Sequence, residues 1–286
     1  MKRVIISADD FGLSEGVNEA VEQAHKAGFL STASLMVAGP AAADAVERAK
    51  RMPDLKVGLH VVAVAGRPVC APHSLPKITD DSGDIRHDQT GLARLLAISP
   101  LAREEMRREI EAQFSTFAAT GLKLDHANAH KHMHLHPIVG RMLIGIGRRY
   151  GLRALRIPME PPAPLRRGGA SPGNTIPAGL LRRWTRLLRA QAHAARLTTN
   201  DACFGIAWSG HMTAPRVRDL AASLPDGLSE IYFHPATRRD ALLERLMPGY
   251  EHETELATLL DPGVAGAFDA AGVIRTDWSR AARGAA

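Results

Sequence analysis

The sequence predicts an α/β fold: an irregular, TIM-barrel-like (β/α) barrel of about seven βα units, in one domain that covers residues 1–286. Short apolar runs rich in β-branched residues alternate along the chain with longer segments whose apolar residues recur at helical spacing. Such alternation is typical of parallel strands joined by helical crossovers. In addition, residues able to do chemistry recur just after the expected strands, where barrel enzymes carry their sites.

A βα unit opens the chain. Residues 4–8 form a short apolar run that stops at two aspartates, Ser14 has the position of a helix N-cap, and Gly28 marks the end of that helix. Further strands are expected at 33–37, 56–64, 122–124, 154–157, 204–207 and 229–233. Further helices are expected at 41–50, 102–120, 138–150, 180–196, 216–222 and 242–246. Segments near 66–90 and 158–178, rich in proline and glycine, are expected to be loop insertions, and the tail after Arg280 to be frayed.

The charge of the chain argues against a nucleic-acid partner. Lys and Arg number 36 against 30 Asp and Glu, a formal net charge of +6. The basic residues form no tract with interleaved aromatics, and aromatic residues make up only 5% of the chain. Because stacking of bases needs aromatic platforms, we expect no nucleic-acid binding.

The cysteines and the first residues indicate a cytoplasmic protein. Cys70 and Cys203 lie far apart and outside any CxxC pattern, which predicts neither a disulfide nor a thiolate zinc site and suits a reducing compartment. The apolar run after Met1 is too short for a secretory signal, and no stretch has the apolar length of a membrane span. Peripheral contact with the inner face of a membrane, and a homodimer, stay open.

Two adjacent aspartates, Asp9 and Asp10, end the first expected strand. If strand geometry persists, their side chains point in different directions, so one can bind a metal ion while its neighbour addresses a water on that metal. The alternative is that both merely cap the following helix. The histidines that follow later strands favour the metal interpretation.

Histidines accumulate after the expected third and fourth strands. His60 lies in an apolar run in which Gly58 permits the close approach of another group, although alone it would more often be a hydrogen-bonded core histidine. Residues 125–137 hold five of the 13 histidines, and in an extended segment His130, His132, His134 and His136 would share one face. A solvated face that binds metal only adventitiously is the alternative.

Ligation by carboxylate and imidazole together selects among metals. One divalent ion is expected, with zinc as the first candidate and manganese, cobalt or nickel as alternatives. Magnesium is less well suited because it prefers oxygen ligands.

Four motifs follow one another along the chain: Ala8-Asp9-Asp10-Phe11-Gly12-Leu13-Ser14, Gly58-Leu59-His60, Ala129-His130-Lys131-His132-Met133-His134 and Tyr232-Phe233-His234-Pro235. In this order they resemble the YdjC-like carbohydrate deacetylases, over most of the chain. The resemblance implies a polysaccharide-deacetylase-like barrel and an enzyme that removes acetate from an N-acetylated amino sugar.

The resemblance also implies roles for particular residues. The metal ligands fall on Asp10, His60 and His130, and Asp9 is then the general base for attack of water on the acetamide carbonyl. His234 is our choice for the acid that protonates the leaving amine. His132 is its rival in that role, and both His132 and His134 are expected to bind substrate.

One position departs from the family pattern. The family usually has Asp-Ser-His where this chain has Asn128-Ala129-His130, so a carboxylate that would orient a histidine is missing. Asn128 can still accept a hydrogen bond, and Asp125 could compensate only if the turn folds back.

Within the family, the chain is most similar to the hopanoid-biosynthesis-associated HpnK branch. The similarity lies in two later stretches, 200–205 and 208–210, and in the order of residues in the histidine cluster. That likeness implies an N-acetylglucosaminyl hopanoid, a glycolipid, as substrate. A basic amphipathic stripe around Trp184 and Leu187 fits membrane contact, although an ordinary barrel helix would show the same pattern.

Three other functions remain as alternatives. They are a soluble chitooligosaccharide deacetylase, a metal-binding protein of the same fold without turnover, and a phosphoesterase. A metal carrier would need neither Asp9 nor His234, and a phosphoesterase with two metals would need further clustered carboxylates.

Overall fold

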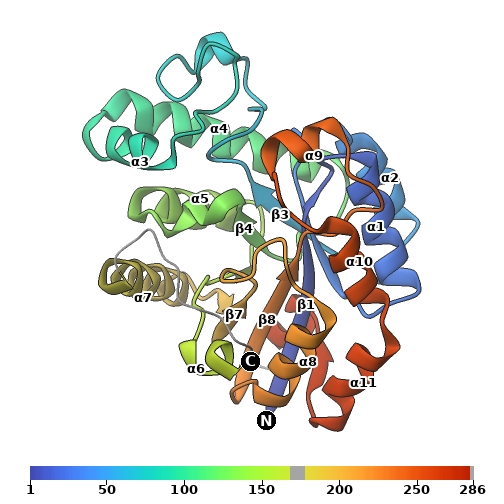
Figure 1. The fold of residues 1–286 in the computed structure, drawn as a ribbon. Helices are drawn as coiled ribbons and strands as arrows, with labels where there is room; N and C mark the ends of the chain where they lie inside the picture. Colours follow the sequence, from blue (N-terminus) through green and yellow to red (C-terminus); the bar gives the residue numbers. More distant parts are fainter. Residues whose placement is uncertain (168–177, 284–286) are drawn as a thin grey trace.

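The computed structural model describes residues 1–167 and 178–283 (Figure 1). Within them, nine strands form one sheet in the order β6-β5-β4-β3-β2-β1-β8-β7, with β9 also paired to β1 and all pairings parallel. The strands are β1 (Lys2–Phe11), β2 (Thr32–Leu35), β3 (Lys56–Val61), β4 (Ala127–Ala129), β5 (Ala154–Leu155), β6 (Thr198–Thr199), β7 (Ala202–Phe204), β8 (Gly227–Phe233) and β9 (Ile274–Thr276). The predicted α/β barrel-like class is confirmed.

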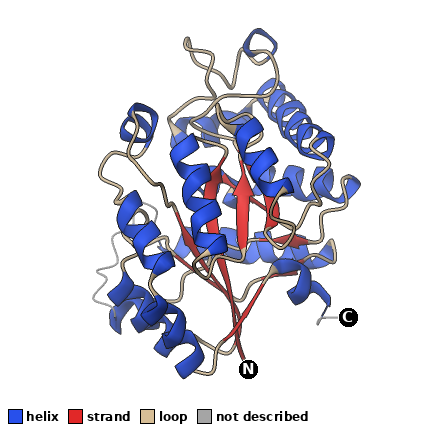
Figure 2. Ribbon diagram, turned by 90° about the vertical axis from the view of Figure 1, so that its right-hand side faces the viewer, coloured by secondary structure: helices blue, strands red, loops and turns tan. Residues whose placement is uncertain are grey.

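The sheet curls around a buried interior without closing. Its pairing path ends at β6 and β7, and these two strands do not pair with each other in the described part of the chain. β1 is the longest strand and the hub of the sheet, because it pairs with β2, β8 and β9. Helices surround the strands, as Figure 2 shows in the view turned by 90°.

The described helices are α1 (Glu15–Lys26), α2 (Ala42–Lys50), α3 (Gln89–Ile98), α4 (Pro100–Ala119), α5 (Pro137–Arg149), α6 (Pro162–Arg167), α7 (Ala178–Ala194), α8 (Ala214–Ser223), α9 (Ala241–Leu246), α10 (His252–Leu260), α11 (Pro262–Ala270) and α12 (Trp278–Arg283), with two short 3₁₀ helices, η1 (Pro72–Ser74) and η2 (His130–Leu135). Ser14 caps α1 as predicted, since its hydroxyl accepts a hydrogen bond from the backbone N–H of Val17.

The predicted strand at 122–124 is wrong. β4 instead lies at Ala127–Ala129, where it pairs with the end of β3. The polar residues His126 and Asn128 hid this strand from a search for apolar runs, yet both are fully buried because they face other polar groups inside the barrel. β6, β9 and the helices α3, α10, α11 and α12 were not predicted either.

The insertions are only partly loops. Residues 66–90 contain η1 and bury Leu75, Ile78 and Ile85, and isolated bridges join Ile85 to Gly66 and Thr79. In Figure 1 this segment lies above α3 and α4, at the end of the barrel toward which β1 runs. In the second insertion α6 occupies 162–167, and residues 168–177 lie outside the described part. The tail after Arg280 continues α12 to Arg283.

The apolar stripe of α7 packs mainly inward. Leu188 is buried and Trp184 is half-buried with its ring edge-on to His136, at a centroid distance of 5.8 Å. Leu187 is the described member of that stripe that is exposed, at 42%. This arrangement fits an ordinary barrel helix. Across the described residues, no helix combines the length and the apolar character needed to cross a bilayer.

Gly58 in β3 permits a close approach, as the sequence suggested. A Cβ atom at this position would lie 2.4 Å from two ring atoms of His126 and 2.6 Å from the His126 carbonyl oxygen. The ring is held from its other side by stacking on Trp278, at a centroid distance of 5.7 Å. The lack of a side chain at Gly58 therefore makes room for a buried histidine on the neighbouring strand.

We expect Gly58→Ala to destabilise the protein by about 1–3 kcal/mol, the usual cost of overpacking a core, because the ring of His126 cannot retreat past Trp278. Gly145→Ala in α5 is the matched control, since a Cβ there meets nothing within 4 Å, and it should be neutral or stabilising. Thermal or urea unfolding of both variants measures the difference. Equal stability of the two would show that the His126 ring has room to move.

Candidate metal centre

Three residues far apart in the sequence meet at the carboxyl ends of the strands: Asp10, His60 and His130. One oxygen of Asp10 lies 3.2 Å from Nε2 of His60 and 3.2 Å from Nδ1 of His130. Their candidate ligand atoms all lie within 4.8 Å of one another, and all three side chains are buried. This cluster could hold a metal ion.

The backbone around Asp10 bends to bring its side chain into the cluster. The register between β1 and β2 shifts between Ala8 and Phe11, and Asp10 has a left-handed φ of 63°. Such a conformation is unfavourable for a residue with a Cβ and is kept mainly where the surroundings enforce it. In this conformation the Asp10 carboxylate lies beside His60 and His130.

The histidine segment does not form the extended face that the sequence suggested. η2 begins directly after β4, and Lys131 and His132 have left-handed φ values of 49° and 55°. The chain therefore turns sharply, and alternate histidines point to different surroundings. His130 alone among them joins Asp10 and His60.

Asp10 has the properties of an anionic ligand. Among the described residues, neither of its buried carboxylate oxygens has a hydrogen-bond donor. Burial would raise the pKa of this carboxyl, but the nearby His130 and His60 outweigh that effect and hold the pKa well below its usual value. A buried, ionised carboxylate without donors is costly unless a cation compensates it, so these residues fit a divalent metal ion.

Asp9 has a different partner. The Arg156 guanidinium donates to both of its oxygens, at 2.5 Å from Nη1 and 2.9 Å from Nη2, and Asn128 donates weakly from 3.3 Å. Burial acts to raise the pKa of Asp9, but the charge of Arg156 prevails and lowers the pKa far below its usual value. Asp9 is therefore an ionised carboxylate next to the cluster.

Sequence reasoning missed Arg156, which is fully buried at the end of β5. Its guanidinium also donates to both oxygens of Glu230 in β8, at 2.9 and 2.7 Å, and stacks 4.6 Å above the ring of Tyr232. The signal was present, because Arg156 and Glu230 each interrupt an apolar run that was predicted to be a buried strand. Two opposite charges at such positions indicate an internal ion pair.

Asn128 supplies the acceptor that the family carboxylate would provide. Its Oδ1 lies 2.6 Å from Nδ1 of His60, and its Nδ2 donates to Ser34 at 2.9 Å. Asp125 does not take the place of the missing family carboxylate beside His60. It binds the backbone and hydroxyl of Ser279 near the other end of β4.

His234 follows β8, and α10 holds its backbone on both sides. The His234 N–H donates to Oε2 of Glu255 at 2.5 Å, and its carbonyl accepts from Nδ1 of His252 at 2.6 Å. Its own Nδ1 is buried and has no hydrogen-bond partner within residues 1–167 and 178–283. Burial lowers the pKa of His234, whereas Asp10 and Asp9 act to raise it.

The other two expected site histidines lie in different surroundings. His132 is half-buried, and its Nε2 lies 3.0 Å from the Tyr232 hydroxyl. Burial and then Arg156 hold its pKa well below the usual value. His134 is fully buried, and its Nε2 donates to the carbonyl of Arg156 at 3.0 Å. In this position His134 holds the turn against β5, and its substrate contact stays a prediction.

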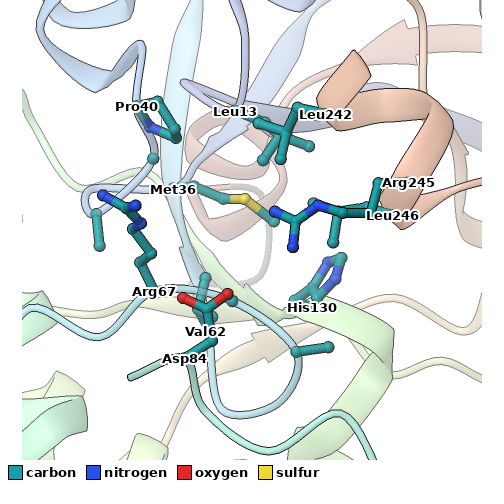
Figure 3. Close-up of a pocket in the computed structure, with 14 residues that line it drawn as sticks. Leu13, Met36, Pro40, Val62, Arg67, Asp84, His130, Leu242, Arg245 and Leu246 are labelled. Carbon is teal, nitrogen blue, oxygen red and sulfur yellow. The ribbon is translucent and has the colours of Figure 1, made fainter. Parts of the chain in front are cut away.

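A pocket opens beside His130 (Figure 3). Most of its wall is apolar, and Figure 3 shows Arg67 and Arg245 on opposite sides of it. Neither arginine has an ion-pair partner in the described part of the chain. The lining residues are Leu13, Met36, Ala38, Gly39, Pro40, Val62, Ala65, Gly66, Arg67, Asp84, His130, Leu242, Arg245 and Leu246.

Comparison with known families agrees with the four sequence motifs. The model of the family described as "YdjC-like protein" matches residues 3–270, nearly the whole chain. The chain belongs to the YdjC-like family. In this YdjC-like protein the matched range includes Asp10, His60, His130 and the strands that carry them.

Named relatives give the same family. A carbohydrate deacetylase of Geobacillus stearothermophilus is 30% identical over 90% of this chain and 89% of its own length. One from Brevibacillus brevis is 38% identical over 56% of this chain, and the match spans 59% of that relative. A crystal structure titled as a putative cellobiose-phosphate cleavage protein of Enterococcus faecalis superposes with a TM-score of 0.77 at 22% identity, covering 98% of both chains. This likeness supports the fold.

The environment of Glu255 in this YdjC-like protein predicts a pH-dependent stability. Burial raises the pKa of Glu255 from 4.5 to about 7, despite hydrogen bonds from the backbone of Met212 and His234. The folded state therefore binds a proton more tightly than the unfolded state, and this group's contribution to stability falls as pH rises from about 4.5 to 7.

Glu255→Gln removes that titration. We expect the unfolding free energy of the wild type, relative to Glu255→Gln, to fall on the order of 2 kcal/mol between pH 4.5 and 7.5. Urea unfolding of both proteins at the two pH values measures it. A constant difference between them would contradict the assignment.

Proposed function

We propose that the protein is a divalent-metal-dependent hydrolase that removes the N-acetyl group from an N-acetylated amino sugar. The observation that carries the proposal is the convergence of Asp10, His60 and His130 beside a separate ionised carboxylate, Asp9. The named relatives, which are carbohydrate deacetylases, support the same reaction. Metal-assisted hydrolysis of an amide requires a set of residues that holds the cation and a general base close to it.

Asp10, His60 and His130 would hold the ion. When bound there, a divalent metal supplies Lewis acidity toward a carbonyl oxygen and lowers the pKa of water. One carboxylate and two imidazoles make zinc our first candidate. Manganese, cobalt, nickel and magnesium are the alternatives.

Asp9 is the proposed general base. Two hydrogen bonds from Arg156 and one from Asn128 occupy three of the roughly four acceptor positions of a carboxylate. One position therefore remains to accept a proton from water. Arg156 keeps the group ionised near neutral pH and fixes its orientation, and the lowered pKa also makes it a weaker base than a free carboxylate.

His234 is the proposed acid for the leaving amine, in preference to His132. Burial lowers the pKa of both rings, so each is neutral near pH 7 in the free protein. The two differ in their neighbours. Asp10 and Asp9 favour the charged form of His234, whereas Arg156 opposes that of His132. His234 is thus better able to take up a proton during the reaction and pass it to the amine, and His132 remains a substrate contact.

We infer that the substrate is a glycolipid, an N-acetylglucosaminyl hopanoid, as the HpnK-like stretches suggest. The pocket beside His130 supports an apolar group next to the sugar, because Leu13, Met36, Leu242 and Leu246 form much of its wall (Figure 3). Arg67 and Arg245 can donate hydrogen bonds to sugar hydroxyls. A lipid presented at the inner face of a membrane would meet the protein at this pocket and not through α7.

A soluble chitooligosaccharide deacetylase is the alternative that keeps the same chemistry. A non-catalytic metal-binding protein is disfavoured, since holding an ion would need neither a second carboxylate, Asp9, nor His234. A phosphoesterase with two metals is also disfavoured, because the only candidate cluster of metal ligands among the described residues is Asp10, His60 and His130.

Two variants separate catalysis from metal binding. We expect Asp9→Asn to keep the metal while losing at least about 100-fold in turnover, the scale of lost general-base catalysis. His60→Ala should lose the metal as well. Acetate release by metal-stripped and zinc-reconstituted protein, together with metal content by elemental analysis, measures both. Full activity of Asp9→Asn would remove the base assignment.

The substrate is tested by comparing an acetylated glycolipid with short N-acetylglucosamine oligomers. Leu246→Gln should reduce kcat/KM for the glycolipid about tenfold, which corresponds to roughly 1.4 kcal/mol of lost apolar contact. The kcat/KM for the oligomers should not change. Leu187→Gln on α7 is the control, because Leu187 is exposed and away from the pocket lining. A wild-type preference for the oligomers would instead support the chitooligosaccharide alternative.

A further inference from the structure

A buried chain of hydrogen bonds runs from Asp125, at the far end of β4, to the candidate metal centre. Nδ1 of His126 lies 3.2 Å from Asp125, and Nε2 of His126 lies 3.1 Å from the Ser34 hydroxyl. The same hydroxyl accepts from Nδ2 of Asn128 at 2.9 Å, and Oδ1 of Asn128 lies 2.6 Å from Nδ1 of His60. The five side chains are between 0 and 5% exposed.

For a neutral His126 ring, the chemistry of each partner fixes the direction of every bond. Asp125 accepts, since Ser279 already donates to it twice, so Nδ1 of His126 is the donor. A neutral His126 then has a lone pair on Nε2, to which the Ser34 hydroxyl donates. The oxygen of Ser34 is left to accept from the Asn128 amide nitrogen.

The last bond of the chain selects the tautomer of His60. With its nitrogen toward Ser34 and Asp9, the Asn128 amide turns its oxygen to His60, which must donate from Nδ1. A neutral His60 then presents the lone pair of Nε2 to the side of Asp10, where a metal would bind. A flipped amide would turn its NH2 group to His60, which would then accept at Nδ1 and carry its proton on Nε2, and it would place two oxygens face to face at Asp9.

We propose that Ser34, His126 and Asp125 are positioning residues that fix the Asn128 amide and thereby the metal-binding tautomer of His60. The inference rests on the metal site of the proposed function but not on its substrate. This positioning role also explains the glycine at position 58, because only a residue without a side chain leaves room for His126. The neutral amide further suits the charge of the site, where Asp9 and Glu230 already share a single arginine, Arg156, and Asp10 lies beside His60 and His130.

Ser34→Ala removes the central link, and Ser229→Ala is a matched control. Both delete a hydroxyl from a buried strand residue, but the hydroxyl of Ser229 has no hydrogen-bond partner in the part of the chain that the structure describes. In metal-free protein, at a pH at which the ring is neutral, long-range ¹H–¹⁵N NMR reads the tautomer of His60. We expect the Nδ1–H form in the wild type and in Ser229→Ala, and a mixture in Ser34→Ala.

Zinc affinity provides the second readout. In competition with a chelating dye, the Kd for zinc should rise about 10- to 100-fold in Ser34→Ala, which is the usual effect of losing a residue that orients a metal-binding histidine. The Kd should be unchanged in Ser229→Ala. Ser34→Thr restores a hydroxyl and should recover part of the affinity. If Ser34→Ala does not fold, His126→Phe replaces it, since the ring can still stack on Trp278 but accepts nothing from Ser34.

The outcomes separate this inference from the proposed function. A Ser34→Ala protein that matches Ser229→Ala in both tautomer and Kd overturns the inference. If the wild type binds no divalent metal, the proposed function fails, while a redistributed His60 tautomer in Ser34→Ala still supports the positioning role. A change in Kd without any change in tautomer also overturns it, because the effect would then come from elsewhere.

Discussion

The buried guanidinium of Arg156, shared between Asp9 and Glu230, is the interaction on which the interior of this barrel depends. It connects β5, β1 and β8 at the level where the strands end, and Tyr232 covers its face. A buried charge is tolerable only if it is paired and hydrogen-bonded, so removal of any one of these partners would leave another uncompensated. The ion pairs therefore hold the side chains at the centre of the site in fixed positions, whereas the residues at its edge are less constrained.

The same interaction explains how two adjacent aspartates come to differ. Asp9 is neutralised by Arg156 and bound by three donors, whereas both oxygens of Asp10 lack a donor. The excess of negative charge thus falls at Asp10, next to the two histidines that could share a cation with it. The left-handed turn at Asp10 brings its carboxylate to His60 and His130, whereas a regular strand would have placed the two aspartates on alternate faces without aiming either at His130.

Support for the site comes from elements that carry no candidate catalytic group. The Asn128 amide contacts both His60 and Asp9, and α10 holds the backbone of His234 through Glu255 and His252. Such second contacts decide which nitrogen of a ring faces a metal and how far a side chain can move. The apolar pocket beside His130 then bears on the choice of substrate, separately from the reaction itself.

The sequence alone determined the fold class, the family and the meeting of Asp10, His60 and His130, because parallel βα units bring the carboxyl ends of their strands to one face. It could not place β4, whose polar residues look like a loop until Arg156, Asp9 and Ser34 are found beside them. Nor could it assign His126 and His134 to structural roles, or pair Arg156 with Asp9 across 147 positions. Those contacts join distant segments, and only the curled sheet decides which buried polar groups face one another.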